Sequence, residues 1–195
     1  RPFDKNRAGT MFSEGSGIVV VESLESALAR GAALGAEVLG HAMNNDAFHM
    51  TAPDTSGKGI TAVIQAALDD AGVKPADVQH VNDHGTGTQY NDKIETTAIK
   101  AIFNHHAYQL VITANKSIIG HTCGAAGTLE SIATIRTLHT GIVPPTIHYE
   151  TPDPDCDLDY VPNVARRCDV RVALCNAYGI GGTNAAVVLA RYEGK

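Results

Sequence analysis

Short blocks of apolar residues alternate along the chain with longer helical stretches, and this alternation restricts the fold more than any other feature of the sequence. The blocks typical of strands are residues 36–42, 78–82, 110–114, 170–175 and 185–190. The segments predicted to be helical are residues 59–71, 91–103 and 120–139. Strands that alternate with helices favour an α/β class of fold, in which helices cover a sheet.

The N-terminal segment adds one strand and one helix to this pattern. Residues 18–21 (IVVV) are consecutive β-branched residues, which is typical of a strand buried on both faces. Ser23 stands where the N-cap of a helix would, and Gly31 stands where a helix would stop. Residues 24–30 are therefore predicted to form a short helix.

The composition excludes several classes of protein. In a chain of 195 residues, 44% apolar and 18% charged residues exclude a disordered protein. The net charge of -6 is opposite to that of proteins that bind nucleic acid through its phosphates. No apolar run approaches the roughly 20 residues of a membrane span, and no signal-peptide pattern is present. We therefore expect neither a nucleic-acid partner nor a membrane.

The cysteines and histidines give no indication of a disulfide or a metal site. No two of the four cysteines have CxxC spacing, which favours free thiols in a cytoplasmic location. His80 and His84 have HxxxH spacing, but this spacing chelates a metal only on a helix, whereas a strand entering a loop is predicted here. We expect no metal and no cofactor.

Polar segments follow three of the predicted strands. One carries His84, the next carries Lys116 and His121, and the last carries Asn176 and the glycine run 179–182. In open α/β sheets, ligands bind beyond the carboxyl ends of the strands. Two imidazoles and an ammonium group at such an edge would polarise a carbonyl and hold a developing negative charge. Spacing alone leaves open whether these residues form an acyl-type site or have ordinary hydrogen-bonding and turn roles.

The motifs of the sequence occur in one order: Arg1–Arg7 (RPFDKNR), Asn82–Thr88 (NDHGTGT), Asn115–His121 (NKSIIGH), Gly124–Gly127 (GAAG) and Asn176–Asn184 (NAYGIGGTN). With these motifs, the chain resembles the C-terminal half of a β-ketoacyl-acyl-carrier-protein synthase, and most of all the type II elongating ketosynthases of fatty acid synthesis. The resemblance extends over residues 1–190 and includes two further segments, 46–51 (DAFHMT) and 156–162 (CDLDYVP).

The resemblance implies the thiolase fold, a duplicated and layered αβαβα structure of which residues 1–195 would be the C-terminal half, as a single half-domain. In this family of acyltransferases, a Cys of the N-terminal half takes the acyl chain as a thioester. Malonyl-acyl carrier protein then loses carbon dioxide, and its carbanion attacks that thioester. The expected partners are an N-terminal half with the Cys nucleophile and an acyl carrier protein with its phosphopantetheine arm. The assembled unit is expected to form a homodimer.

The chain begins at Arg1 rather than Met. We therefore expect it to be a fragment, a processed product or one piece of a larger polypeptide. Half of a duplicated fold would leave a large apolar face open, which isolated domains avoid. This favours a tight complex with the N-terminal half.

By resemblance, four residues belong to the catalytic machinery. His84 and His121 would be the two histidines of the Cys-His-His set, whose N–H groups stabilise the enolate formed on decarboxylation. Lys116 would be the lysine of the motif, and Glu130 would be the carboxylate to which it is tied. Because a buried lysine needs a partner, this pair would order the histidines.

Further residues match substrate-binding positions of the family. Thr86 and Thr88 would hydrogen-bond the phosphopantetheine arm. Gly179, Ile180 and Gly181 would belong to the gating loop, and the backbone N–H of Ile180 would contribute to an oxyanion hole. Ile180 stands where the elongating enzymes usually have Phe, so an aromatic gate is missing.

Asp83 also departs from the family pattern, which usually has a small residue there. A carboxylate next to His84 is expected to raise the pKa of its imidazole. The segment with the nucleophile is absent from the sequence, and none of the four cysteines replaces it.

Two alternative functions remain open. The chain could be a non-catalytic subunit, like the chain-length factors of type II polyketide systems, although those usually lose the catalytic residues that are present here. The glycines at 179–182 could indicate a nucleotide-binding module. A dinucleotide fingerprint, however, follows a first strand and opens a helix, whereas these glycines precede a strand near the chain end.

Overall fold

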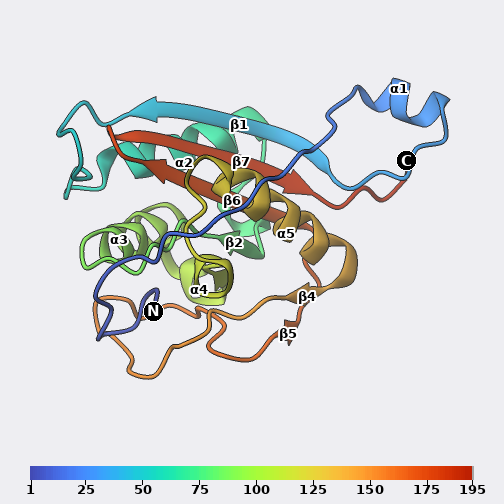
Figure 1. Ribbon diagram of the computed structural model, residues 1–195. Coiled ribbons are helices and arrows are strands. Elements are labelled where there is room, and N and C mark those ends of the chain that lie inside the picture. Colours follow the sequence, from blue (N-terminus) through green and yellow to red (C-terminus); the bar gives the residue numbers. More distant parts are fainter. Residues whose placement is uncertain (195) are drawn as a thin grey trace.

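A mixed sheet of five strands forms the centre of the molecule (Figure 1), as described by a computed structural model of residues 1–194. Its strands are β1 (Glu37–Asn45), β2 (His80–Asn82), β3 (Val111–Thr113), β6 (Val172–Gly179) and β7 (Thr183–Ala190). They lie in the order β1-β7-β6-β2-β3, with antiparallel pairing among β1, β7 and β6 and parallel pairing of β2 with β6 and β3. A separate small ribbon pairs β4 (Ile142–Val143) with β5 (Arg166–Arg167).

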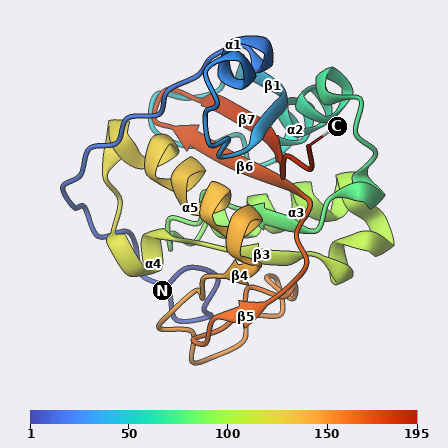
Figure 2. The same ribbon diagram turned by 90° about the vertical axis from the view of Figure 1, so that its right-hand side faces the viewer.

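Helices cover both faces of the sheet, as the two views in Figure 1 and Figure 2 show. The α-helices are α1 (Leu24–Ala29), α2 (Lys58–Ala71), α3 (Asn91–Phe103), α4 (Lys116–Ile119) and α5 (Ala126–Thr140). Short 3-10 turns lie at Pro75–Asp77, Asn104–Gln109 and Cys123–Ala125. Helices α2 and α3 pack on one face and α5 packs on the other, which gives the layered arrangement expected from the sequence.

The alternation of side chains along the strands explains why both faces are covered. In β6, Leu174 joins the core under α2 and α3, whereas Ala173 joins the core that contains Leu138 of α5. In β7, Val188 and Leu189 divide between the two cores in the same way. Successive residues of a strand point to opposite faces, so each strand contributes to both layers. Burying one such aliphatic side chain stabilises the fold by about 1.5–3 kcal/mol.

Helix α5 begins later than the sequence predicts. The prediction placed a helix over residues 120–139, whereas the structure has the short helix α4, an irregular link and then α5 from Ala126. Gly120 has φ 74° and Cys123 has φ 51°, and these left-handed values interrupt a right-handed helix. The interruption places His121 in an irregular segment rather than on a helix.

The predicted strand at residues 18–21 is not paired in the structure. The segment is extended and runs across the α5 side of the molecule (Figure 1), and its four side chains are 44–90% exposed. Gly15 and Gly17 bring the preceding backbone against Leu129 and Thr128 of α5. Pairing fails because no other strand among the described residues lies beside this segment. The prediction that these residues are buried on both faces is therefore wrong for this chain.

Other predicted elements are confirmed. Helix α1 begins after Ser23, whose side chain accepts a hydrogen bond from the N–H of Ser26, and α2 ends at Gly72 with φ 62°. Helix α3 has the predicted bounds, Asn91–Phe103. Among the described residues, none of the helices combines the length and the apolar character that crossing a membrane requires.

Candidate active site

The first part of the site is the loop that follows β2. His84 lies two residues beyond the end of β2, at the carboxyl edge of the sheet. Gly85 comes next with φ 45°, and a Cβ atom there would lie 2.4 Å from the Cβ of Ala114. Glycine therefore lets the loop turn closely over the end of β3, and this turn fixes where the imidazole of His84 can lie.

Buried acids at the start of α3 hold this loop. The carboxylate of Glu95 accepts the backbone N–H groups of His84 and Gly85, each at 2.8 Å. Asp92 accepts the N–H of Gly87 at 3.1 Å. Anionic side chains at a helix N-terminus are also favoured by the helix dipole. The backbone of the loop is thus anchored to α3 by side chains with no solvent exposure.

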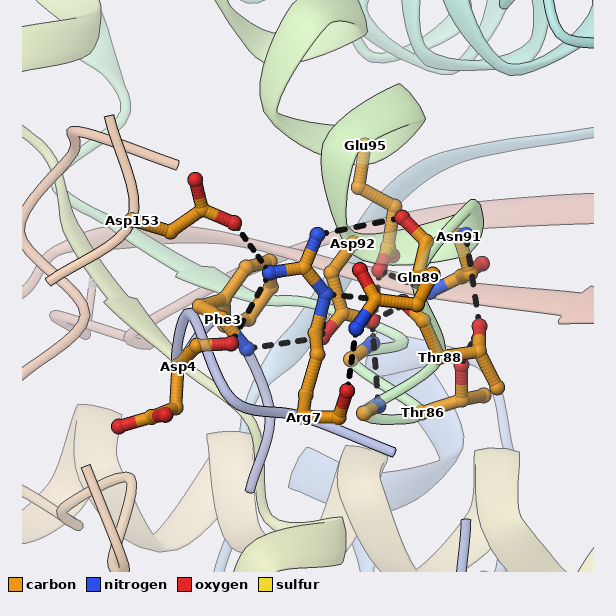
Figure 3. Close-up of polar contacts among 12 residues, drawn as sticks. Phe3, Asp4, Arg7, Thr86, Thr88, Gln89, Asn91, Asp92, Glu95 and Asp153 are labelled. Carbon is orange, nitrogen blue, oxygen red and sulfur yellow. Dashed lines mark hydrogen bonds and ion pairs between the residues drawn. The ribbon is translucent and has the colours of Figure 1, made fainter. Parts of the chain in front are cut away.

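Arg7 fixes the other end of the same loop (Figure 3). Its guanidinium donates to the backbone oxygens of Thr88 at 3.0 Å and Gln89 at 3.1 Å. It also pairs with Asp153 at 2.5 Å and lies 3.7 Å from Asp92. The fixed fork of donors on arginine suits this multiple contact. Arg7 therefore joins the N-terminal segment, the loop and the segment around Asp153 in one buried network.

Lys116 brings the second predicted segment to the first. The side chain is buried at the start of α4, where its Nζ forms an ion pair with the Glu130 carboxylate on α5. The same Nζ donates to the backbone oxygen of His84 at 2.7 Å and lies 3.1 Å from its Nδ1. Lys116 therefore links the His84 loop to α5.

These contacts assign the tautomers of both histidines. The ammonium group of Lys116 has only donors, so Nδ1 of His84 accepts and the ring proton is on Nε2. In His121, Nδ1 accepts the backbone N–H of Cys123 at 3.2 Å, which again places the proton on Nε2. The two rings are 5.4 Å apart and almost perpendicular, with an interplanar angle of 86°. Two Nε2–H donors therefore belong to neighbouring rings.

The surroundings keep both histidines neutral. Burial lowers the pKa of His84 well below its usual value, and the charge of Lys116 and the neighbouring ring of His121 lower it further. Burial and the charge of Lys116 also lower the pKa of His121. The prediction that the pKa of His84 is raised is wrong, because burial and Lys116 dominate the shift. A neutral imidazole can donate from Nε2 while it accepts at Nδ1.

Burial raises the pKa of Glu130 to about 7, although the ion pair with Lys116 opposes this shift. The carboxyl group therefore titrates near neutral pH. Its second oxygen, Oε2, is buried without a hydrogen-bond partner among the described residues. The Lys116–Glu130 pair thus depends on pH in a range where His84 remains uncharged.

The two histidines line an open cavity of about 520 Å³. Thr86 and Thr88 also line it, and their hydroxyl oxygens lie 3.0 Å apart. The turn between β6 and β7 contributes Gly179 and Ile180, with the Ile180 side chain 79% exposed. The structure therefore gathers at one cavity the histidines, threonines and turn residues that the sequence predicts at three separate strand ends.

Three predicted residues lie outside the cavity lining. Lys116 contacts His84 from behind, and Glu130 in turn contacts Lys116, so neither side chain lines the cavity. Gly181 donates its N–H to the backbone oxygen of Met50 at 2.9 Å and accepts from the Asn45 side chain at 2.8 Å. These bonds tie the turn between β6 and β7 to the loop that follows β1.

The two buried thiols, those of Cys156 and Cys175, are poorly suited to be nucleophiles. Burial raises the pKa of Cys156 to about 11 and that of Cys175 to about 12, and a thiol attacks as its thiolate. Cys123 is exposed at the cavity beside His121. Within residues 1–194, no group of three or more His, Cys, Asp and Glu side chains is placed to hold a metal ion.

Residues 35–150 match the family described as "Beta-ketoacyl synthase, C-terminal domain". The chain belongs to this family. The resemblance inferred from the motifs is therefore confirmed, and the chain is a C-terminal ketosynthase domain.

Curated relatives agree with this assignment. The 3-oxoacyl-(acyl-carrier-protein) synthase 2 of Synechocystis sp. is 49% identical over 193 residues, which are 99% of this chain and 46% of that protein. Nodulation protein E of Rhizobium meliloti is 50% identical over 187 residues, 96% of this chain and 46% of that protein. The chain thus spans about half the length of the curated relatives it matches.

Solved ketosynthase structures have the same layered fold. A type II polyketide synthase acyl-carrier protein in complex with its ketosynthase includes a chain that superposes with a TM-score of 0.96 at 38% identity, over 98% of this chain and 47% of that one. The ishigamide ketosynthase/chain length factor gives a TM-score of 0.94 at 47% identity, with the same coverage. The predicted thiolase-like layered fold is confirmed by these likenesses.

Several residues of this ketosynthase domain escaped the sequence analysis. Phe12, which is 67% exposed, and Cys123 line the cavity beside His121, and the ring of Tyr178 meets His84 edge-on at 5.5 Å. Glu95 was also missed as the anchor of the His84 loop. A signal for it was present, because Asn91 and Glu95 are four residues apart and share one helix face directly after the glycine-rich loop.

Proposed function

We propose that this domain supplies the enolate-stabilising half of a ketosynthase active site, for the decarboxylative condensation of an acyl thioester with malonyl-acyl carrier protein. The observation that carries the proposal is the pair of Nδ1 contacts, from Lys116 at 3.1 Å to His84 and from Cys123 at 3.2 Å to His121. They leave two neutral Nε2–H donors on rings that line one cavity.

The chemistry follows from these two donors. When a malonyl thioester loses carbon dioxide, the electrons of the broken C–C bond move to the α-carbon and the thioester oxygen. Two preorganised N–H groups at that oxygen stabilise the enolate as it forms. The α-carbon then attacks an acyl thioester on a cysteine, and the cysteine thiolate leaves. Each donor contributes about 2.7–4 kcal/mol to lowering the barrier.

Lys116 and Glu130 act as positioning residues in this proposal. Lys116 keeps Nδ1 of His84 in its acceptor role and holds the backbone oxygen of the same residue. Glu130 supplies the opposite charge that a buried ammonium group requires. Neither side chain needs to touch the substrate.

Thr86 and Thr88 are proposed to bind the phosphopantetheine arm of an acyl carrier protein. Their hydroxyl groups lie at the cavity beside the histidines, on the loop that Arg7 and α3 hold rigid. Gly179, Ile180 and Gly181 would form the gate. An exposed aliphatic side chain at Ile180 presents a smaller and more flexible barrier than an aromatic ring would.

The proposal requires a companion N-terminal half that supplies the cysteine nucleophile. The buried Cys156 and Cys175 do not serve, because burial raises the pKa of both thiols. Residues 18–21 present an extended, exposed run of aliphatic side chains beside α5, and exposed apolar surface of this kind marks an interface. We assign this run to contact with the companion half, and we expect the assembled unit to form a homodimer.

The test uses the assembled protein, in which this domain and its N-terminal half are both present. His84→Ala and His121→Ala are each expected to slow decarboxylation of malonyl-acyl carrier protein by about 10²–10³-fold. His105→Ala is the matched control, because His105 is exposed on the turn after α3. A wild-type rate in both histidine variants, with His105→Ala also unchanged, would overturn the proposal.

A second candidate is a non-catalytic partner subunit. It is favoured by one observation, the 47% identity to the ishigamide ketosynthase/chain length factor. The same variants separate the two functions. A non-catalytic subunit would keep full condensation activity after loss of both histidines, whereas variants at its contact with the companion half would lose it.

A further inference from the structure

Asp83 and Glu95 form a pair of buried carboxyl groups behind His84. Both side chains have no solvent exposure, and they lie within hydrogen-bonding reach of each other. Asp83 directly precedes His84, and Glu95 holds the backbone N–H of His84. The pair therefore joins the end of β2 to α3 at the position that orients the imidazole.

The hydrogen-bond donors around the two carboxyls are unequal. Glu95 accepts three N–H groups, from the backbone of His84 and Gly85 at 2.8 Å each and from the Asn91 side chain at 2.6 Å. Asp83 accepts one, from Asn176 at 3.2 Å. Its other oxygen, Oδ2, is buried and has no donor among the described residues. N–H donors stabilise a carboxylate anion, so the donor set favours the charge on Glu95.

No cation near the pair is free to neutralise it within the described part of the chain. Lys116 is held by Glu130, and Arg7 is held by Asp153 and Asp92. Burial raises the pKa of both carboxyl groups above their usual values. The titratable groups around the pair among the described residues are His84 on the loop, Asp92 on α3, Lys116 on α4, Glu130 on α5, Tyr178 on β6 and the buried Tyr160 in the segment before β5.

We propose that Asp83 is protonated at neutral pH and donates its carboxyl proton to Glu95, and that this bond makes Asp83 a pH-dependent positioning residue for His84. The added proton gives Asp83 Oδ2 the partner it otherwise lacks, because two ionised carboxylates have no proton to share. It also leaves a single negative charge on the residue that receives three N–H donors. The link to catalysis by His84 rests on the function proposed above.

The proton makes the fold sensitive to alkaline pH. In the unfolded chain, Asp83 is ionised above about pH 4, whereas the folded protein keeps the proton to higher pH. The folded state therefore binds more protons in this interval, and its stability falls as the pH rises through it. Loss of the proton leaves two buried anions side by side, which push the end of β2 away from α3.

The direct test is infrared spectroscopy of the assembled protein at neutral pH. The carbonyl stretch of a protonated carboxyl group differs from the stretches of a carboxylate. Glu130, whose pKa is about 7, also contributes such a band near neutral pH, so the quantity to measure is the difference between the spectra of the wild type and Asp83→Asn. We expect the protonated-carboxyl band in this difference spectrum. The matched control is Asp77→Asn, the same chemical change at an exposed residue one turn before β2, and its difference spectrum against the wild type should lack the band. Absence of the band from the difference between the wild type and Asp83→Asn would overturn the proposal.

Unfolding measurements provide a second test that needs no enzymatic activity. The side-chain amide that Asp83→Asn introduces can donate to Glu95 at every pH. As the pH rises above the ordinary pKa of an aspartate, about 4, the folding equilibrium constant of the wild type should fall relative to that of Asp83→Asn by up to tenfold per pH unit, until the folded protein also loses the proton. Asp77→Asn should follow the wild type. Parallel stability curves for the wild type and Asp83→Asn would overturn the proposal.

The catalytic consequence has its own readout. Decarboxylation of malonyl-acyl carrier protein should decline on the alkaline side in the wild type, and Asp83→Asn should extend activity to higher pH. An equal decline of decarboxylation activity at alkaline pH in the wild type and Asp83→Asn would overturn the positioning role of Asp83. A protein without decarboxylation activity that still shows the infrared band and the stability difference would contradict the proposed function and leave the buried proton established.

Discussion

The Nζ atom of Lys116 lies 2.7 Å from the backbone oxygen of His84 and 3.1 Å from Nδ1 of the same residue. A single ammonium group therefore controls both the position of the loop and the tautomer of the ring. The same charge lowers the pKa of His84, as does burial, so the ring remains a neutral donor. The lysine acts through His84, and its own side chain does not face the cavity.

Replacing Lys116 with Met should remove this control while keeping much of the buried volume. Without the ammonium group, His84 can place its proton on Nδ1, which removes the Nε2–H donor from the cavity. We expect decarboxylation in the assembled protein to slow by about 10²-fold, mainly in kcat. Lys93→Met is the control, because Lys93 is 55% exposed and its ion pair, with Asp155, lies at the surface. An unchanged kcat in Lys116→Met would contradict the assigned tautomer.

The ion pair between Lys116 and Glu130 makes a separate prediction about stability. Glu130→Leu should destabilise the assembled protein by about 3–5 kcal/mol, because it leaves a buried ammonium group without an opposite charge. The double variant Lys116→Met with Glu130→Leu should lose less than the sum of the two single variants. Urea unfolding of the wild type, the two single variants and the double variant measures these losses. A pH of about 8 keeps Glu130 ionised, since its pKa is about 7. Additive losses would show that the two side chains do not interact.

The sequence predicted the elements whose signals are local. Helix α3 has its predicted bounds, and the cap at Ser23 and the stop at Gly72 lie where the residue types indicated. The strand predicted at residues 18–21 is unpaired, because strand formation depends on a neighbour that a local pattern does not reveal. The start of α5 was missed because Gly120 and Cys123 have positive φ values, and at Gly120 the backbone also approaches Ser13 and Met11 closely, a tertiary contact that a local pattern does not reveal.

The candidate site was also predicted from the sequence only in part. The motifs identified His84, His121 and Lys116, and the structure brings them together at one sheet edge. The pKa shift of His84 was predicted with the wrong sign, because burial and the charge of Lys116 lower this pKa. Such effects depend on which atoms face each other, and neighbours in sequence need not face each other in space.

His80 predicts a loss of stability in acid. The ring is fully buried in β2, and burial alone lowers its pKa from 6.5 to about 3. Below pH 6.5, His80 therefore binds a proton in the unfolded chain but not in the folded protein. The free energy of unfolding falls by up to about 1.4 kcal/mol per pH unit as the pH drops towards 3. His80→Leu should flatten this acid slope in urea unfolding, even if its stability at neutral pH is lower. His105→Leu, at an exposed ring, should keep the wild-type slope; equal slopes in all three proteins would refute a neutral buried His80.

A comparison of Gly85 with Gly72 can separate a steric clash from backbone strain. Gly85 and Gly72 both have positive φ, 45° and 62°, so alanine meets similar backbone strain at each position, about 1 kcal/mol. At Gly72 a Cβ atom meets nothing within 4 Å, whereas at Gly85 it would lie 2.4 Å from the Cβ of Ala114. We expect Gly72→Ala to show the strain alone and Gly85→Ala to lose about 1–3 kcal/mol more, measured as free energy of unfolding of the assembled protein.

The same clash should also displace His84 in the candidate active site. To relieve it, the loop must move away from β3, and His84 moves with it because the two residues share a peptide bond. Lys116 then loses its contact with Nδ1, so Gly85→Ala should slow decarboxylation as strongly as Lys116→Met, by about 10²-fold. Gly72→Ala should keep the wild-type rate after allowance for its folded fraction. A Gly85→Ala protein that is destabilised and fully active would show that the position of His84 does not depend on the close approach of this loop to β3.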